Sequence, residues 1–267
     1  MRWLQLLPAM HSTAVAARRF RDVIHKMEHV IFSAAQLHDT CEMLSIPVIV
    51  TEQYPKALKH TVPEIDVKRD NTTVVEKTLF SMVTPVRYEF DRSPANACSS
   101  QPPFRVLFPS AGRSLKCSVQ EVEAALSAHP ARKHAIIVGI EAHVCALQST
   151  YDLIERGVRK PQLWLCCCEF PDRVLIVSVA RPRSHRVCGV WNCSQYTVHI
   201  VADAISSQRP LDRSIGIHRM VAAGGQLTSA ESTMFELLRS KDHPQFKMVS
   251  ALCKRERPPE EAQLTTL

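Results

Sequence analysis

The chain has 267 residues, of which 45% are hydrophobic and 22% charged, and its formal net charge is +7. This composition is typical of a folded protein and excludes a wholly disordered chain, and no apolar run reaches the about eighteen residues that a membrane span needs. The positive excess lies in residues 86–120, with five basic residues against two acidic ones, and in residues 159–197, with six against two. Because nucleic-acid binders spread positive charge over an ordered surface with interleaved aromatics, we expect no nucleic-acid partner.

The chain alternates between β-branched runs and amphipathic segments. The runs are typical of buried parallel strands, and the segments between them repeat apolar residues at helical spacing. Strands that alternate with helices predict an α/β domain, a three-layer structure whose parallel sheet has helices on both faces. The expected order is helix 20–44, strand 46–51, strand 134–140, helix 144–156, strand 198–202, helix 211–223, strand 226–228 and helix 229–239.

Two segments interrupt this alternation. Residues 86–120 are rich in proline and serine and show no sustained periodicity, and residues 159–197 delay the strand after Gly157 by about forty residues. Connections between a helix and a strand normally take roughly two to six residues. We therefore interpret both segments as irregular insertions.

Seven of the ten cysteines fall in these two segments, and Cys41, Cys145 and Cys253 lie elsewhere. No signal peptide with a proper apolar core is present, so we expect an intracellular, reduced and cytoplasmic protein. The stretch from Met1 to Phe20 has arginines and no acids, which is similar to a mitochondrial transit peptide and equally to an amphipathic surface helix. A mitochondrial location is therefore the alternative.

A zinc site in the second insertion is the weakest of the candidate sites. Its soft ligands would be cysteines and a histidine, but the pair Cys188 and Cys193 lacks the two-residue spacing of a zinc knuckle. Three adjacent cysteines cannot all reach one tetrahedral ion, so we expect no metal. The ligands considered are Cys166, Cys167, Cys168, His185, Cys188 and Cys193.

Cys145 is the residue whose position favours catalysis. It follows the strand 134–140 after a four-residue turn and opens a predicted helix. Ligands of open α/β sheets bind at the carboxyl ends of strands, and a helix N-terminus lowers a thiol pKa. The alternative is a small buried core residue, because free cysteine is among the most buried residue types.

Several strings in this chain resemble one known family. The string VGIEAHVCALQSTYDLIERG resembles the nucleophile region of the isochorismatase-like cysteine hydrolases. The strings TEQYPKAL, EKTLFSMV, VHIVADAISSQRPLDR and KDHPQFK are similar to animal isochorismatase domain-containing proteins. The resemblance implies a domain at 18–255 with the insertions 86–120 and 159–197, an atypical segment at 1–17 and a polar tail at 256–267.

The resemblance implies roles for four residues. Cys145 matches the nucleophile, and Lys77 matches a lysine that would stabilise the thiolate and the oxyanion. Without the resemblance, Lys77 would be read as a solvated surface charge. The family also implies a non-proline cis peptide at Ile140–Glu141, which would direct the N–H groups of Glu141 and Cys145 at an oxyanion.

The third member of the implied site, an aspartate, is missing. Alignment of Phe20 and Arg21 with the family's aromatic–arginine pair places Val15 at the aspartate position, and residues 1–17 contain no acid. Pro8 makes this stretch a poor central strand because proline cannot donate to a ladder. We therefore expect the first strand and its carboxylate to be absent, as in an isoform or gene model with an alternative start and retained non-coding segments.

The expected function is that of a hydrolase acting on a small molecule through a covalent Cys145 intermediate, on an amide or enol-ether-like carbon. Loss of the aspartate predicts impaired catalysis. Glu52 and Tyr54 are candidate pocket residues, although Tyr54 could equally pack before Pro55, and no phosphate loop or cofactor motif is present. The alternatives are a non-catalytic member that binds a small molecule or a protein, and a chain that does not fold stably. The resemblance also implies a homo-oligomer.

Overall fold

The structure is a computed structural model, and it describes residues 9–12, 20–83, 119–155 and 196–259. Almost all of the two expected insertions, 86–120 and 159–197, lies outside the described residues, as do Val15 and the zinc ligands considered above. The insertions, the domain boundaries and the interpretation as an atypical isoform therefore stay predictions.

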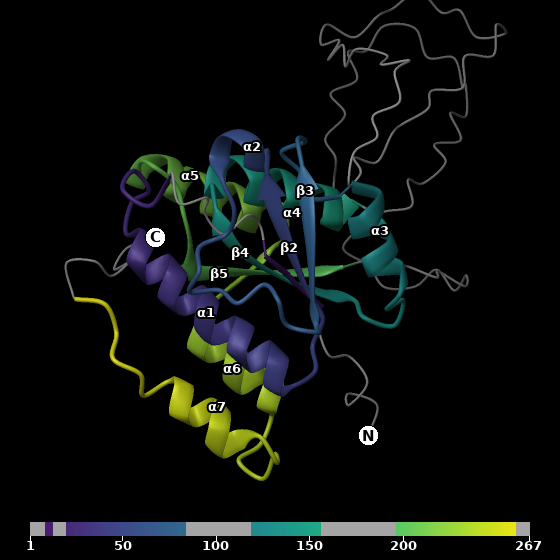
Figure 1. The fold of residues 1–267 in the computed structure, drawn as a ribbon, viewed down its shortest axis with the longest axis vertical. Helices are drawn as coiled ribbons and strands as arrows, with labels where there is room; N and C mark the ends of the chain where they lie inside the picture. The colour runs from purple at the N-terminus through teal and green to yellow at the C-terminus, as the bar shows by residue number, and fades with distance from the viewer. Residues whose placement is uncertain (1–8, 13–19, 84–118, 156–195, 260–267) are drawn as a thin grey trace, which may run out of the picture.

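A six-stranded parallel sheet forms the centre of the molecule (Figure 1). The order of the strands is β3-β2-β1-β4-β5-β6, and every neighbouring pair is parallel. Such a sheet places the carboxyl ends of all its strands on one edge, where open α/β sheets bind ligands. The strands are β1 (Ala9–Ser12), β2 (Val48–Gln53), β3 (Thr72–Lys77), β4 (His134–Ile140), β5 (Thr197–Ser206) and β6 (Gln226–Thr228).

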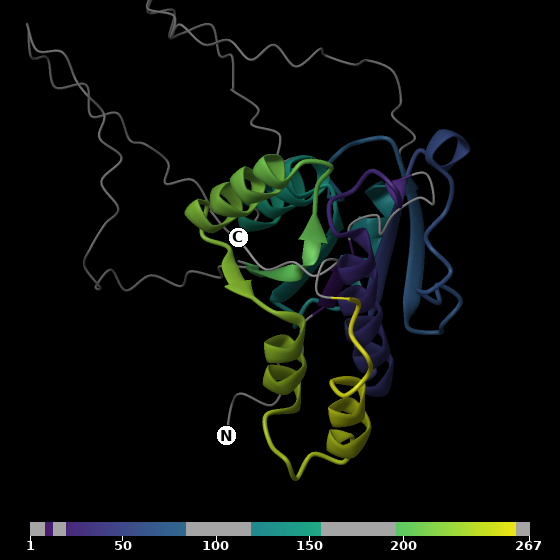
Figure 2. The ribbon, with the colours of Figure 1, turned by 90° about the vertical axis from the view of Figure 1, so that its left-hand side faces the viewer.

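Helices cover both faces of the sheet. One core packs α1 (Met27–Met43), α6 (Ala230–Leu238) and α7 (Phe246–Leu252) against one face. The other core packs α3 (Val119–Ser127), α4 (Leu147–Glu155) and α5 (Pro210–Ala222) against the opposite face, and the short α2 (Pro55–Leu58) follows β2. Figure 2 shows the first group together on its side of the sheet.

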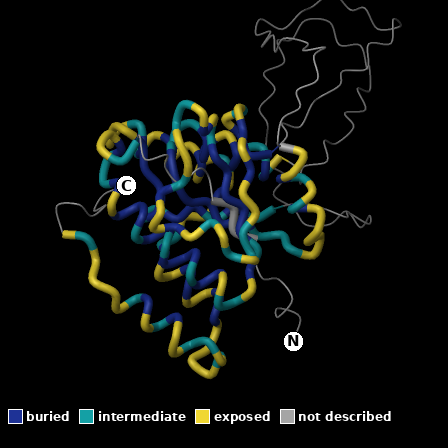
Figure 3. Tube along the Cα trace, in the orientation of Figure 1, coloured by how far each residue is buried: buried dark blue, intermediate teal, exposed yellow. Residues whose placement is uncertain are grey.

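The two cores follow from the alternation of side chains along each strand. Val48 and Val50 of β2 belong to the core with α1, whereas Ile49 belongs to the core with α4. Successive strand residues point to opposite faces, so a strand covered on both sides carries apolar residues toward both. Figure 3 shows the resulting buried centre. The three-layer α/β fold predicted from the sequence is confirmed.

The expected absence of a first strand is wrong. Strand β1 lies between β2 and β4, with Met10 in register with Val48 on one side and Ile136 on the other. Pro8 precedes the first residue of the strand, so the ladder does not need the N–H group that proline lacks. The argument from Pro8 therefore failed because it placed the proline inside the strand.

The helix predicted for residues 20–44 begins later, at Met27. Lys26 is left-handed, with φ 55°, and ends the preceding turn. The backbone of His25 is held by the end of β5, because its N–H donates to the Ser207 carbonyl (2.9 Å) and its carbonyl accepts from the Ser206 hydroxyl (2.6 Å). These tertiary hydrogen bonds compete with the helical ones and keep residues 20–26 at the carboxyl edge of the sheet.

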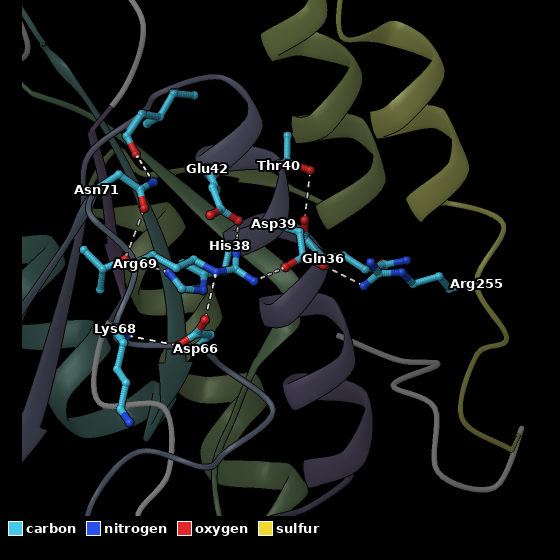
Figure 4. A network of polar contacts seen from close by, with 12 residues as sticks. Gln36, His38, Asp39, Thr40, Glu42, Asp66, Lys68, Arg69, Asn71 and Arg255 are labelled. Carbon is cyan, nitrogen blue, oxygen red and sulfur yellow. Dashed lines mark hydrogen bonds and ion pairs between the residues drawn. The ribbon is translucent and has the colours of Figure 1, made fainter.

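A polar network fastens α1 to two connecting segments on the outside of the molecule (Figure 4). The Asp39 carboxylate accepts from Arg69, in the connection between β2 and β3, and from Arg255, after α7, each at 2.6 Å. Asn71 donates to the Ile46 carbonyl (2.8 Å) and fixes the entry to β3. The network therefore fixes the segment that leads into β3.

Candidate active site

A cavity of about 270 Å³ opens at the carboxyl edge of the sheet. Its walls come from the segments that follow β2, β3 and β4 and from the turn before α1, and most of the surface is apolar. Cavities at this edge are the usual ligand sites of parallel α/β sheets. The lining residues are Phe20, Glu52, Gln53, Leu58, Lys59, Thr61, Phe80, Ile140, Glu141, Val144 and Cys145.

Cys145 reaches this cavity from a wide turn after β4. The peptide bond between Ile140 and Glu141 is cis, at the position that the resemblance implies, and a π-helical turn over Ala142–Ala146 follows it. The Ala146 N–H donates to the Glu141 carbonyl five residues earlier, at 3.2 Å. Such turns are frequent at functional sites. The thiol therefore lies in a π-helical turn that leads into α4, rather than at the start of a regular α-helix.

The expected lowering of the Cys145 pKa is wrong. Burial raises the pKa of this thiol, because the side chain is only 7% exposed and the thiolate loses its hydration. The Lys77 charge and hydrogen bonds from Lys77 and the Glu141 N–H lower the pKa, and the Glu141 charge raises it further. The effect of desolvation on the pKa is larger than that of the Lys77 charge and the hydrogen bonds. At neutral pH the free site therefore holds mainly the thiol.

Lys77 is a buried cation and not a surface charge. It ends β3 and is 2% exposed, and its ammonium donates to Gln53 Oε1 (2.6 Å) and to the carbonyls of Leu79 and Phe80 (2.9 Å each). It also acts on Cys145 through charge and a hydrogen bond. The structure therefore brings together the two residues assigned by resemblance, and Gln53 orients the lysine.

Glu52 lines the cavity, but its carboxylate is engaged by the connection after α2. Thr61 donates its N–H and its hydroxyl to Oε1, and His60 Nδ1 lies 2.8 Å from Oε2. Burial would raise the pKa of Glu52, and these hydrogen bonds outweigh it and lower the pKa. Tyr54 is 52% exposed and is not among the residues that line the cavity.

Glu141 contributes both its backbone and its side chain. Its N–H donates to Cys145, while its carboxylate accepts from Gln208 Nε2 (2.8 Å) and lies 3.5 Å from His143 Nδ1. The same His143 nitrogen lies 2.9 Å from the Ser207 hydroxyl. Compared with Glu52, this carboxylate has fewer fixed partners and lies nearer the thiol in sequence.

Sequence reasoning missed the residues that form the walls and supports of the site. Phe20 and Val144 line the cavity from the ends of predicted helices and Phe80 lines it from a connection, so no apolar pattern marked them as wall residues. Gly216 lies in the predicted helix 211–223 and packs against the backbone of Ala142. An isolated glycine in a helix was the one sequence feature that could have indicated this close contact. Ser149 carried no signal, because a serine inside a helix is common.

The described parts of the chain hold no candidate for two further kinds of site. No group of three histidine, cysteine, aspartate or glutamate residues there could hold a metal ion. No described helix is both long and apolar enough to cross a membrane.

No protein-family model matches the chain. Isochorismatase domain-containing protein 1 of Danio rerio is 29% identical over 236 residues, which cover 88% of this chain and 57% of that protein. Isochorismatase family protein 1B of Dictyostelium discoideum is 28% identical over 242 residues, 90% of this chain and 82% of that protein. The chain thus spans less than two thirds of the length of the zebrafish relative.

Solved structures give the same result. The structure described as MAR1 ribonuclease from Caenorhabditis elegans superposes with a TM-score of 0.63 at 29% identity, covering 97% of each chain. The motifs, the sheet order and these similarities agree along the described length. In sequence and in fold the chain is therefore similar to the isochorismatase-like proteins, among them the isochorismatase domain-containing proteins of animals.

Proposed function

We propose that the protein is a hydrolase of small molecules in which Cys145 is the nucleophile. The observation that carries the proposal is the convergence of two donors, the Lys77 ammonium and the Glu141 N–H, on one buried thiol in a cavity. Donors directed at a reacting group in a water-poor site are the usual source of rate enhancement. This arrangement suits the formation of a thiolate and of an oxyanion beside it.

The proposed reaction has two halves. The Cys145 sulfur attacks the carbonyl carbon of an amide and forms a C–S bond, and the N–H groups of Glu141 and Cys145 stabilise the oxyanion as the resemblance implies. The C–N bond then breaks, and the amine leaves with the proton that the thiol released. Water then attacks the thioester carbon, the C–S bond breaks, and the carboxylic acid leaves as the thiol takes back a proton.

We further propose that turnover is slow. The sequence has no acid before Asp22, so the segment around β1 supplies no aspartate to carry the proton. General acid–base groups are typically worth about 10²–10⁴-fold in rate. Of the two carboxylates that line the cavity in the described chain, Glu52 is fixed by His60 and Thr61. Without a proton carrier, both the departure of the amine and the hydrolysis of the thioester should be slow.

The cavity suits a small and largely apolar substrate. Leu58, Phe80 and Val144 form much of its wall, and the polar atoms of Glu52 and Gln53 already have partners within the protein. The worm relative is described as a ribonuclease. A single-stranded RNA site needs a basic groove with stacking aromatics, whereas most of the surface of this cavity is apolar. No cofactor enters the proposed reaction, and a homo-oligomer stays a prediction.

The alternative is a non-catalytic member that binds a small molecule or a protein through the same cavity. It is favoured by the raised pKa of Cys145, which leaves little thiolate at neutral pH.

The test is a panel of small neutral amides incubated with the full chain, with release of amine and the mass of Cys145 peptides measured together. We expect slow amine release and a Cys145 acyl adduct, both lost in Cys145→Ala and retained in Cys253→Ala. A ligand-dependent rise in Tm without any adduct would support the binding alternative. Cleavage of an RNA oligonucleotide by the wild type, unaffected by Cys145→Ala, would overturn the proposal.

A further inference from the structure

Ser149 connects the nucleophile turn to the loop that holds Lys77. Its side chain is fully buried in the first turn of α4. The hydroxyl donates to the Cys145 carbonyl at 2.7 Å and accepts from the Met82 N–H at 3.0 Å. A serine in a helix often donates to the carbonyl four residues earlier, so the first contact alone would be ordinary. The second contact crosses to a segment 67 residues away in sequence.

The segment that Ser149 contacts is the one that fixes the lysine. Leu79 and Phe80 accept hydrogen bonds from the Lys77 ammonium, and Met82 lies two residues further along. Lys77 in turn contacts the Cys145 thiol. A closed path therefore runs from the Cys145 carbonyl through Ser149, Met82 and Phe80 to Lys77, and back to the sulfur of the same cysteine.

We propose that Ser149 is a positioning residue, whose hydroxyl sets the separation between the Cys145 sulfur and the Lys77 ammonium. This inference rests on the proposed role of Cys145 as the nucleophile. The side chains of Ser149, Lys77 and Met82 are buried, with Lys77 2% and Met82 1% exposed, whereas Phe80 enters the path through its backbone carbonyl and its residue is 54% exposed. Charge interactions depend steeply on distance where water is excluded, so a small shift of the loop changes how strongly the lysine stabilises a thiolate.

The neighbouring residue provides a matched control. Thr150 is also fully buried, but its hydroxyl contacts the Met220 sulfur on α5 at 3.2 Å. Thr150→Val therefore removes a buried hydroxyl from the same helix without touching the Lys77 loop. Ser149→Ala removes the proposed link, and Ser149→Thr keeps a hydroxyl at that position.

The experiment measures the rate of Cys145 alkylation by iodoacetamide between pH 6 and 11 on the full chain, resolved by peptide mass. We expect Ser149→Ala to raise the midpoint of the profile by about half to one pH unit, a fraction of the about 1–3 units that a neighbouring opposite charge provides. Ser149→Thr should stay near the wild type. Thr150→Val should lower Tm and leave the midpoint unchanged.

A background without the lysine separates the two proposals. If Ser149 acts through Lys77, Ser149→Ala should add no further shift to Lys77→Met. A Lys77→Met profile identical to wild type would overturn the proposed activation of Cys145 itself. A lysine-dependent midpoint that Ser149→Ala leaves unchanged would overturn only the role of Ser149.

The unmodified protein gives a second measurement should Ser149→Ala fail to fold. Because the Met82 N–H donates to Ser149, its amide should exchange with solvent deuterium as slowly as the buried β3 amide of Val75. Fast exchange at Met82 while Val75 remains protected would also overturn the inference.

Discussion

Gly216 of α5 lies directly against the backbone of Ala142 in the π-helical turn Ala142–Ala146, which carries Cys145. A Cβ atom at position 216 would stand 2.8 Å from the Ala142 carbonyl carbon and 2.8 Å from the His143 nitrogen. Both atoms are backbone, so neither can rotate away as a side chain would. The close approach of α5 therefore limits where the turn, and with it Cys145, can lie.

Gly216→Ala should displace the turn and slow alkylation of Cys145 several-fold, besides destabilising the fold by about 1–3 kcal/mol through overpacking. Site-resolved labelling and thermal melts check the two effects. Gly224→Ala is the control, since its added Cβ meets no atom within 4 Å and its cost comes from φ +110°. Equal loss of Cys145 labelling in both variants would mean that the effect is only loss of stability.

The three cysteines of the described chain should differ in reactivity. Cys41 is fully buried, and burial raises its pKa to about 12, so it should not label in the folded protein. Cys145 also has a raised pKa, but it lines a cavity beside Lys77, whereas Cys253 is half-buried away from any lysine contact of this kind. We expect labelling of Cys145 to exceed that of Cys253 at neutral pH and to rise with pH as the thiolate forms.

Lys77→Met provides the internal check on this order. Loss of the ammonium removes a contact that lowers the Cys145 pKa, so alkylation of Cys145 should become slower while alkylation of Cys253 keeps its rate. Faster labelling of Cys253 than of Cys145 in the wild type would contradict the special reactivity of the candidate nucleophile.

The sequence predicted β2, β4, β5, α5 and α6 because their apolar patterns are continuous or periodic. It missed β3, whose residues Thr73, Val74 and Glu76 are exposed on the edge of the sheet, so the strand has no unbroken apolar run. It also denied β1, since a four-residue strand beside a proline carries little signal. Residues 9–12 form a strand because they pair with β2 and β4, and a local sequence pattern does not reveal such pairing.

The candidate site was predictable to the extent that motifs carry it. Cys145 and Lys77 were identified by resemblance, and the structure brings them together. The sign of the Cys145 pKa shift was not predictable, because it depends on burial by Phe80, Val144 and other walls from distant segments. The hydrogen bonds that engage Glu52 arise from a connection whose course a sequence pattern does not give.

Acid should weaken the fold through His38. Its side chain is buried in the network of Figure 4, where Nε2 lies 2.9 Å from the Thr72 hydroxyl and Nδ1 has no hydrogen-bond partner among the described residues. Burial, with help from the Arg69 charge, lowers the pKa of His38 to about 4. The unfolded chain, with an ordinary pKa of about 6.5, then binds more protons than the native state between these values.

The free energy of unfolding should therefore fall as the pH is lowered from about 6.5 to 4, with a slope of roughly 1.4 kcal/mol per pH unit for one proton taken up on unfolding. Urea unfolding at several pH values measures it. His199, whose pKa burial also lowers to about 4, adds a second share of the slope. His38→Asn should flatten the profile, and a His38→Asn profile as steep as wild type would contradict the assignment.

An aspartate placed after β1 should raise turnover. Ser12, the last residue of β1, is in register with Val50 on one side and Val138 on the other, so the carboxyl end of β1 lies between the strands that carry Glu52 and the Cys145 turn. Without a first strand, substituting one residue would not have tested where the family's aspartate belongs. Because β1 is present, Val15→Asp becomes a direct test of the alignment, with Thr13→Asp and Ala14→Asp as register controls. One of the three should increase amide hydrolysis by up to about 10²–10⁴-fold, the range of a general acid–base group, and Cys145→Ala should abolish the gain.

Robust turnover by the unmodified chain would show that another carboxylate already carries the proton. In that case Glu141→Gln should reduce the rate more than Glu52→Gln, because hydrogen bonds from Thr61 and His60 hold the Glu52 carboxylate in place.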